Sequence, residues 1–152
     1  MRRNIILMAL LALFCACDDS DEEKDMTYPE ISVNGTPTDG QRYHRGDTIC
    51  MSYSFSDNLE LGKYNIEIHN NFDHHTHSTS SVDVDLDEDK EAVNPWVFNQ
   101  DYDIPSGLTT YSPSVYIVVP DDIDTGDYHF MIRLTDHVGW QQIKSVAVKI
   151  IE

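Results

Sequence analysis

Hydrophobic and polar residues alternate with a period of two along most of the chain beyond residue 28. The alternation is clearest in residues 49–55, 64–68, 82–86, 115–119, 128–134 and 146–150. This period places one set of side chains inward and the other outward, as in half-buried β-strands. Turn-forming sequences such as NGTPTDG and PDDIDTGD separate the runs, and no stretch keeps a helical period over ten residues. The pattern predicts an all-β chain.

The number of strands and the sequence of the C-terminal segment make the fold prediction more specific. Six to eight short strands in about 120 residues favour two packed antiparallel sheets. The sequence GDYHFMIRLTDHVGW is similar to the last hairpin of bacterial immunoglobulin-like domains, with Gly126, Tyr128, Asp136 and Gly139 at the matching positions. We therefore expect an immunoglobulin-like antiparallel β-sandwich of about seven strands over residues 28–152.

The N-terminus has the features of an export signal. Arg2 and Arg3 precede an apolar run that is too short to span a membrane, which is typical of a secretory signal peptide over residues 1–16. Cys17, in LFCAC, resembles the lipidated cysteine of a bacterial lipoprotein, and DDSDEEKD then forms an acidic tether within residues 17–27. These features predict an outer-membrane lipoprotein, displayed at the cell surface or on the periplasmic face.

Charge and cysteine content limit the possible partners. The formal net charge is −17, and removal of residues 1–16 with their two arginines makes it −19. Such a surface repels nucleic acid and concentrates cations, so no nucleic-acid partner is expected. Beyond Cys17 only Cys50 remains, which excludes a disulfide within the mature chain.

Histidines cluster in HNNFDHHTHSTS, residues 69–80, which holds four of the seven in the chain. In an immunoglobulin-like sandwich, the strand at 62–69 and the strand at 127–135 are antiparallel neighbours. His69, at the end of the first, is therefore expected beside His129, at the start of the second, on the same outward face.

The loop after residue 69 can complete a metal site. His75 and His77 are two residues apart, so in extended backbone both face one side, whereas His74 faces the other. Neutral imidazoles from His69, His75, His77 and His129 would suit Zn²⁺, Cu²⁺ or Ni²⁺. Binding should weaken as the pH falls through about 6. Asp73 and Glu67 are candidate acceptors that would orient the ligand rings. His137 is expected in a turn at the far end.

Other interpretations of the same residues remain open. The histidines could form a hydrogen-bonded structural cluster or act in catalysis without metal, although no convincing general base is present and no enzyme is predicted. Asp83, Asp85 and Asp87 have calcium-loop spacing but lack its glycine turn, so we assign them to the outer face of a strand. Four aromatic residues could instead make the chain an adhesion or glycan-binding module, unless they anchor the core: Trp96, Phe98, Tyr102 and Tyr111.

The lipoprotein start, YNIEIHNNFDHHTHS and GDYHFMIRLTDHVGW together resemble the domain of unknown function 4625 family of Bacteroidetes lipoproteins, over residues 27–152. The resemblance implies an immunoglobulin-like fold and the cell envelope, and supplies no activity. Our functional hypothesis therefore rests on the histidines: a lipid-anchored domain that captures or delivers a transition metal, most simply zinc, beside an envelope transporter or surface protein.

Overall fold

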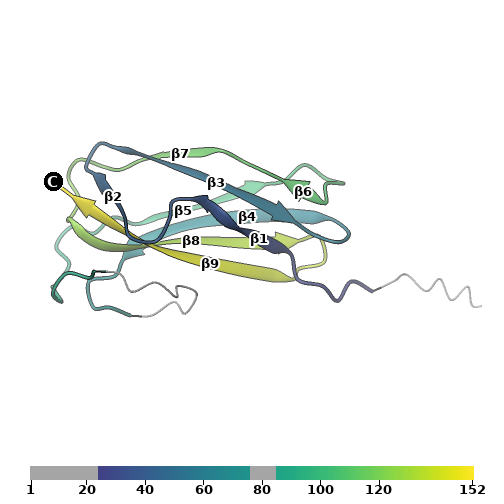
Figure 1. Ribbon diagram of the computed structural model, residues 1–152, viewed down its shortest axis with the longest axis horizontal. Helices are drawn as coiled ribbons and strands as arrows, with labels where there is room; N and C mark the ends of the chain where they lie inside the picture. The colour runs from purple at the N-terminus through teal and green to yellow at the C-terminus, as the bar shows by residue number, and fades with distance from the viewer. Residues whose placement is uncertain (1–23, 76–84) are drawn as a thin grey trace, which may run out of the picture.

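The computed structural model describes residues 24–75 and 85–152, and these residues form a two-layered β-sandwich (Figure 1). Within these two ranges, no helix has the length and hydropathy needed to cross a membrane. The strands are β1 Glu30–Thr36, β2 Gln41–His44, β3 Thr48–Ser56, β4 Leu61–Asn70, β5 Phe98–Asp103, β6 Thr110–Tyr111, β7 Val115–Val118, β8 Gly126–Asp136 and β9 Gln141–Ile151.

The two sheets have the strand order of an immunoglobulin-like sandwich. One sheet has the order β2-β9-β8-β4-β5, in which β2 runs parallel to β9 and the other neighbours are antiparallel. The other sheet has the order β1-β3-β6, with β7 also paired to β3. The predicted sandwich is thus confirmed, and β4 and β8 are adjacent in the interior of their sheet, as the predicted pairing of His69 with His129 requires.

The core comes from the inward set of each alternating run. Ile66 and Ile68 of β4 and Phe130 and Ile132 of β8 are fully buried, and they belong to one core cluster with Ile49 and other apolar side chains of the opposite sheet. Burial of each such side chain contributes about 1.5–3 kcal/mol relative to its exposure to water. The period-two pattern therefore predicted the correct inward face of these strands.

The strand expected at residues 82–86 is wrong where the structure describes it. Residues 82–84 lie outside the described ranges, whereas Asp85 and Leu86 are not in a strand and Leu86 is 42% exposed. The segment is instead held by side-chain contacts. Lys149 Nζ donates to the carbonyl of Asp85 and to Oδ1 of Asp87, both at 2.8 Å. Pairing with Lys149 also lowers the pKa of Asp87. An alternating pattern alone was insufficient to form a strand here, because strand formation depends on the neighbours that the segment meets.

A buried tyrosine ties the start of β8 to two loops. The hydroxyl of Tyr128 donates to the carbonyl of Asp124 at 2.7 Å and accepts a hydrogen bond from the backbone N–H of Trp96 at 3.2 Å. Its ring meets that of Phe72 edge-on, with 5.4 Å between the centroids. Burial raises the pKa of Tyr128, so the hydroxyl stays neutral. The loop that follows β4 is thereby packed onto β8.

Replacing Tyr128→Phe should lower the free energy of unfolding by about 1–3 kcal/mol, because the Trp96 N–H loses its acceptor while buried. Denaturant unfolding measures the loss. Tyr116→Phe is the matched control, since this tyrosine of β7 is exposed and should tolerate the change. Equal stability of Tyr128→Phe and the unmodified chain would contradict the assigned role of the hydroxyl.

Candidate metal centre

The site is built on the central strand pair of the five-stranded sheet. His69 of β4 lies directly opposite His129 of β8 in the antiparallel register. Their neighbours Ile68 and Phe130 also oppose each other and point into the core, so the two histidines point to the outer face. The ring centroids of His69 and His129 are 5.5 Å apart, as expected for directly opposed residues. The predicted juxtaposition is confirmed.

A turn after β4 brings a third imidazole onto this pair. The N–H of Asn71 donates to the carbonyl of Asp127 at 2.8 Å, which carries the pairing of β4 and β8 one residue further. His74 then adopts a left-handed conformation with φ of 52°, which reverses the chain direction. His75 Nδ1 contacts Oδ1 of Asp73, and the carbonyl of His75 accepts a hydrogen bond from Nε2 of His129 at 3.1 Å. The loop thus folds back over the sheet end.

The three rings form a nearly equilateral triangle. The centroid of His75 lies 5.4 Å from that of His69 and 5.2 Å from that of His129. His69 and His75 are nearly parallel at 13°, whereas His129 is inclined by 62° and 68° to them. The three imidazoles therefore converge from β4, from β8 and from the loop.

Exposure increases from the sheet toward the loop. His129 is 8% exposed, whereas the side chains of His69 and His75 are 19% and 39% exposed. The cluster is therefore covered on the side of the sheet and accessible from the side of the loop.

Both predicted acceptors contact histidine rings of the cluster. Oε1 of Glu67 lies 3.1 Å from Nδ1 of His69, and the Asp73 carboxylate contacts Nδ1 of His75. The hydrogen bond from His75 lowers the pKa of Asp73. A neutral imidazole that donates from Nδ1 carries its lone pair on Nε2, so the hydrogen bond to Asp73 favours the tautomer of His75 in which Nε2 can bind a metal. His129, which donates from Nε2, would bind through Nδ1.

The ring spacing fits a tetrahedral zinc ion. A Zn–N bond of about 2.0–2.1 Å places each imidazole centre about 3.2 Å from the metal, so two ligand rings lie about 5.2 Å apart. One nitrogen from each of these three rings does not, however, lie within 4.8 Å of the other two. Within residues 24–75 and 85–152, the group of three ligand atoms within 4.8 Å of one another consists of carboxylates, from Asp25, Asp57 and Asp136 at the other end of the sandwich. Binding of a common ion would require changes in the side-chain torsion angles that bring one nitrogen of each ring toward the centre of the cluster.

The remaining candidates lie elsewhere. His74 Nδ1 is 2.7 Å from Oδ1 of Asp89, and His137 is in the β8–β9 turn at the opposite end, as predicted. His77 and Cys17 lie outside the described residues. Cys50 is in β3, in the other sheet, and takes no part in the cluster.

The aromatic residues behave as core anchors. Trp96 is buried, and Phe98, Tyr102 and Tyr111 pack against the core, with Tyr102 stacked on Tyr64 at 4.8 Å. They do not form an exposed platform of the kind that sugar rings stack on.

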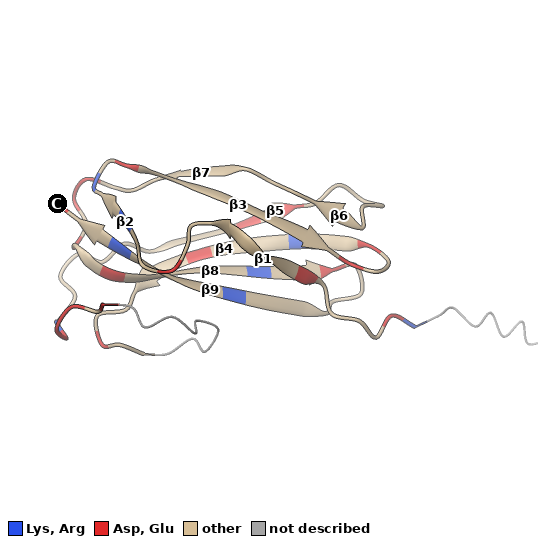
Figure 2. Cartoon of the chain, viewed as in Figure 1, with Lys and Arg blue, Asp and Glu red and all other residues tan. Residues whose placement is uncertain are grey.

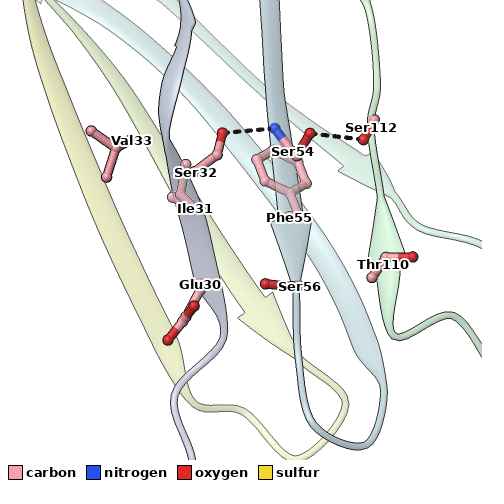
Figure 3. A pocket seen from close by; sticks show the side chains of 9 residues that line it. All are labelled: Glu30, Ile31, Ser32, Val33, Ser54, Phe55, Ser56, Thr110 and Ser112. Carbon is pink, nitrogen blue, oxygen red and sulfur yellow. Dashed lines mark hydrogen bonds between the residues drawn. The ribbon is translucent and has the colours of Figure 1, made fainter.

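A separate groove of about 410 Å³ runs between β1, β3 and β6 (Figure 3). Three of the hydroxyls in its lining make hydrogen bonds: Ser32 Oγ accepts from the N–H of Ser54 at 3.0 Å, and Ser54 Oγ lies 2.9 Å from Ser112 Oγ. Glu30 is the one carboxylate among the residues that line it. A single carboxylate does not make a set of metal ligands.

No curated protein matches the sequence. Among solved structures, the chain is similar to the crystal structure of Spo0M, a sporulation control protein from Bacillus subtilis, with a TM-score of 0.45 and 7% sequence identity. The match covers 84% of this chain and 51% of the other, so the chain spans about half the length of that neighbour. A likeness of this size carries no inference about function. A family model described as a domain of unknown function, DUF4625, matches residues 15–151, and the chain therefore belongs to this family.

Proposed function

We propose that this protein binds a transition metal, most simply Zn²⁺, through His69, His75, His129 and His77, and that it captures or delivers the metal in the cell envelope. The observation that supports the proposal best is the mutual spacing of three imidazoles. Their centroids are 5.2–5.5 Å apart, close to the spacing of about 5.2 Å in a tetrahedral zinc site.

The surrounding charges favour a metal ion over an empty structural cluster. Three histidines at this distance repel one another when protonated, so the arrangement is stable chiefly when they are neutral or metal-bound. Glu67 and Asp73 contact two of the rings through Nδ1, which is the usual arrangement around metal-bound histidines.

The exposure of the loop favours exchange over permanent retention. His75 is the most exposed of the three rings, and it belongs to a loop, whereas His69 and His129 are fixed on paired strands. Metal could therefore enter and leave through movement of the loop while the sheet stays intact. This behaviour suits capture or delivery more than a closed structural zinc site.

The location in the envelope is supported by the sequence. A signal peptide over residues 1–16, lipidation at Cys17 and an acidic tether would hold the domain at the outer membrane, on the surface or on the periplasmic face. A chain with 27 acidic and 10 basic residues also raises the local concentration of cations. The natural partner would be an envelope transporter or surface protein that supplies or receives the metal.

Calorimetric titration of the purified full chain with Zn²⁺ at pH 7.5 should give one site per chain. The double variant His75→Ala/His77→Ala should weaken binding at least about a hundredfold, because two of the ligands are lost. His137→Ala is the matched control, since it removes an exposed histidine at the opposite end and should leave binding unchanged. Zinc binding that survives in the double variant, or that falls equally in the control, would refute the ligand assignment.

Asp73→Asn should weaken zinc binding about tenfold while leaving one site per chain, because a neutral amide orients and polarises the His75 ring less than a carboxylate does. The same titration measures the effect. Asp89→Asn is the control, since Asp89 makes a similar contact to Nδ1 of His74, outside the cluster. If the two variants bind zinc with the same affinity, the role given to Asp73 is wrong.

A further inference from the structure

Three carboxylates meet at the end of the sandwich opposite the histidines. Asp25 belongs to the N-terminal segment, Asp57 follows β3 and Asp136 ends β8, and one oxygen from each lies within 4.8 Å of the others. Figure 2 shows acidic segments at this end in the N-terminal stretch, the β3–β4 turn and the end of β8. Segments far apart in the sequence thus place like charges side by side.

Two carboxylate oxygens in this group are buried without a hydrogen-bond partner. Asp136 is only 3% exposed; its Oδ1 accepts from the N–H groups of Gly139 and Trp140 at 2.6 and 2.8 Å, whereas its Oδ2 is buried and unpartnered. Asp57 repeats the arrangement, with Oδ1 bonded to the N–H groups of Leu59 and Glu60 at 2.9 Å and Oδ2 buried and unpartnered. In each residue the backbone fixes one oxygen and leaves the other for a ligand.

Among the described residues, no basic side chain balances the negative charges of these carboxylates. In the part of the chain that the structure describes, no lysine, arginine or histidine nitrogen lies within 4.0 Å of the carboxylates of Asp25, Asp57 or Asp136. Buried carboxylates are normally paired, hydrogen-bonded or bound to a metal. The missing partner of Oδ2 in Asp136 and Asp57 is therefore best supplied by a cation.

The N-terminal segment is held in place to contribute its ligand. The indole Nε1 of Trp140 donates to the carbonyl of Asp25 at 3.0 Å, and the ring of Tyr28 packs on Trp140 with 4.8 Å between centroids. The Asp25 carboxylate in turn accepts from the N–H of Thr27 at 3.0 Å. Trp140 follows the turn that Asp136 organises, so the same short turn positions two of the three carboxylates.

We propose that Asp25, Asp57 and Asp136 bind a Ca²⁺ ion, which joins the segment at residues 24–28 to the sandwich. Hard oxygen ligands suit Ca²⁺, and oxygens on opposite sides of this ion lie about 4.8 Å apart, since each bond is about 2.4 Å long. Mg²⁺ demands shorter bonds and near-ideal octahedral geometry, which three carboxylates from separate segments satisfy less readily. Backbone carbonyls and water would complete the shell.

The site is independent of the histidine cluster in place and in chemistry. Imidazoles at one end favour zinc and carboxylates at the other favour calcium. Calcium would fix the direction in which the N-terminal tether leaves the domain, and would thereby orient the histidine end relative to the anchor.

Calorimetric titration of the chelator-treated full chain with CaCl₂ should give one site, with a Kd of about 10⁻⁴–10⁻³ M, as in extracellular calcium modules. Asp57→Asn should weaken binding at least about tenfold, because the amide removes a charged ligand. Asp122→Asn, which changes an exposed aspartate outside the group, should bind Ca²⁺ like the unmodified chain. Calcium should also slow tryptic cleavage after Lys24, which precedes Asp25 in the sequence.

The same titrations distinguish the two proposed metal sites. Asp57→Asn should keep its zinc affinity, and His75→Ala should keep its calcium affinity. Circular dichroism of Asp57→Asn and Asp25→Asn checks that each variant is folded, and a folded Asp25→Asn should also bind Ca²⁺ more weakly. The proposal is overturned if the unmodified chain binds no Ca²⁺ up to about 10 mM, if the folded variants bind like the unmodified chain, or if Asp122→Asn weakens binding equally.

Discussion

Antiparallel pairing of β4 with β8 fixes the core and the histidine cluster at once. The register that opposes His69 and His129 on the outer face also opposes Ile68 and Phe130 on the inner face. A slip of one residue would turn the histidines into the core and the apolar side chains into water, so hydrophobic burial holds the register. The position of two imidazoles is thus set by the same free energy that stabilises the sandwich, without a dedicated scaffold.

The two ends of the sandwich differ in the chemistry that they present. At the end where β4 finishes and β8 begins, imidazole rings lie close together, and carboxylates contact two of them. At the other end, carboxylates lie close together, and backbone N–H groups donate hydrogen bonds to them. A soft-to-borderline ion suits the first set and a hard ion suits the second. The segment at residues 24–28 packs against Trp140 at the carboxylate end, so the chain enters the sandwich at the end opposite the histidines.

The alternation of hydrophobic and polar residues, together with the strand order of immunoglobulin-like sandwiches, predicted most of the fold and the central histidine pair of the site. Alternation identified the inward faces of β3, β4 and β8, and the neighbour relation between β4 and β8 placed His69 beside His129. The contacts of Glu67 and Asp73 followed from their spacing to the histidines. The position of His75 depends on the left-handed backbone conformation of His74, which the residue types in this segment do not predict.

Features that depend on distant segments were missed. Residues 82–86 alternate like a strand, yet Asp85 and Asp87 bind Lys149 of β9 instead. The short parallel strand β2 lacks a strong pattern and forms because β9 offers it an edge. The sequence did not predict the carboxylate group, because Asp57 and Asp136 occur in ordinary turn sequences and Asp25 lies in the acidic segment at the N-terminus. Only their convergence in space distinguishes them, and sequence patterns do not report it.

X-ray absorption at the zinc edge of the zinc-loaded protein tests the central claim most directly. We predict a first shell of nitrogen or oxygen at about 2.0–2.1 Å, with the outer-shell scattering of three or four imidazole rings. A shell of oxygen ligands without imidazole scattering would contradict this prediction, because the zinc would then be bound by the acidic surface and not by the histidines that β4 and β8 bring together.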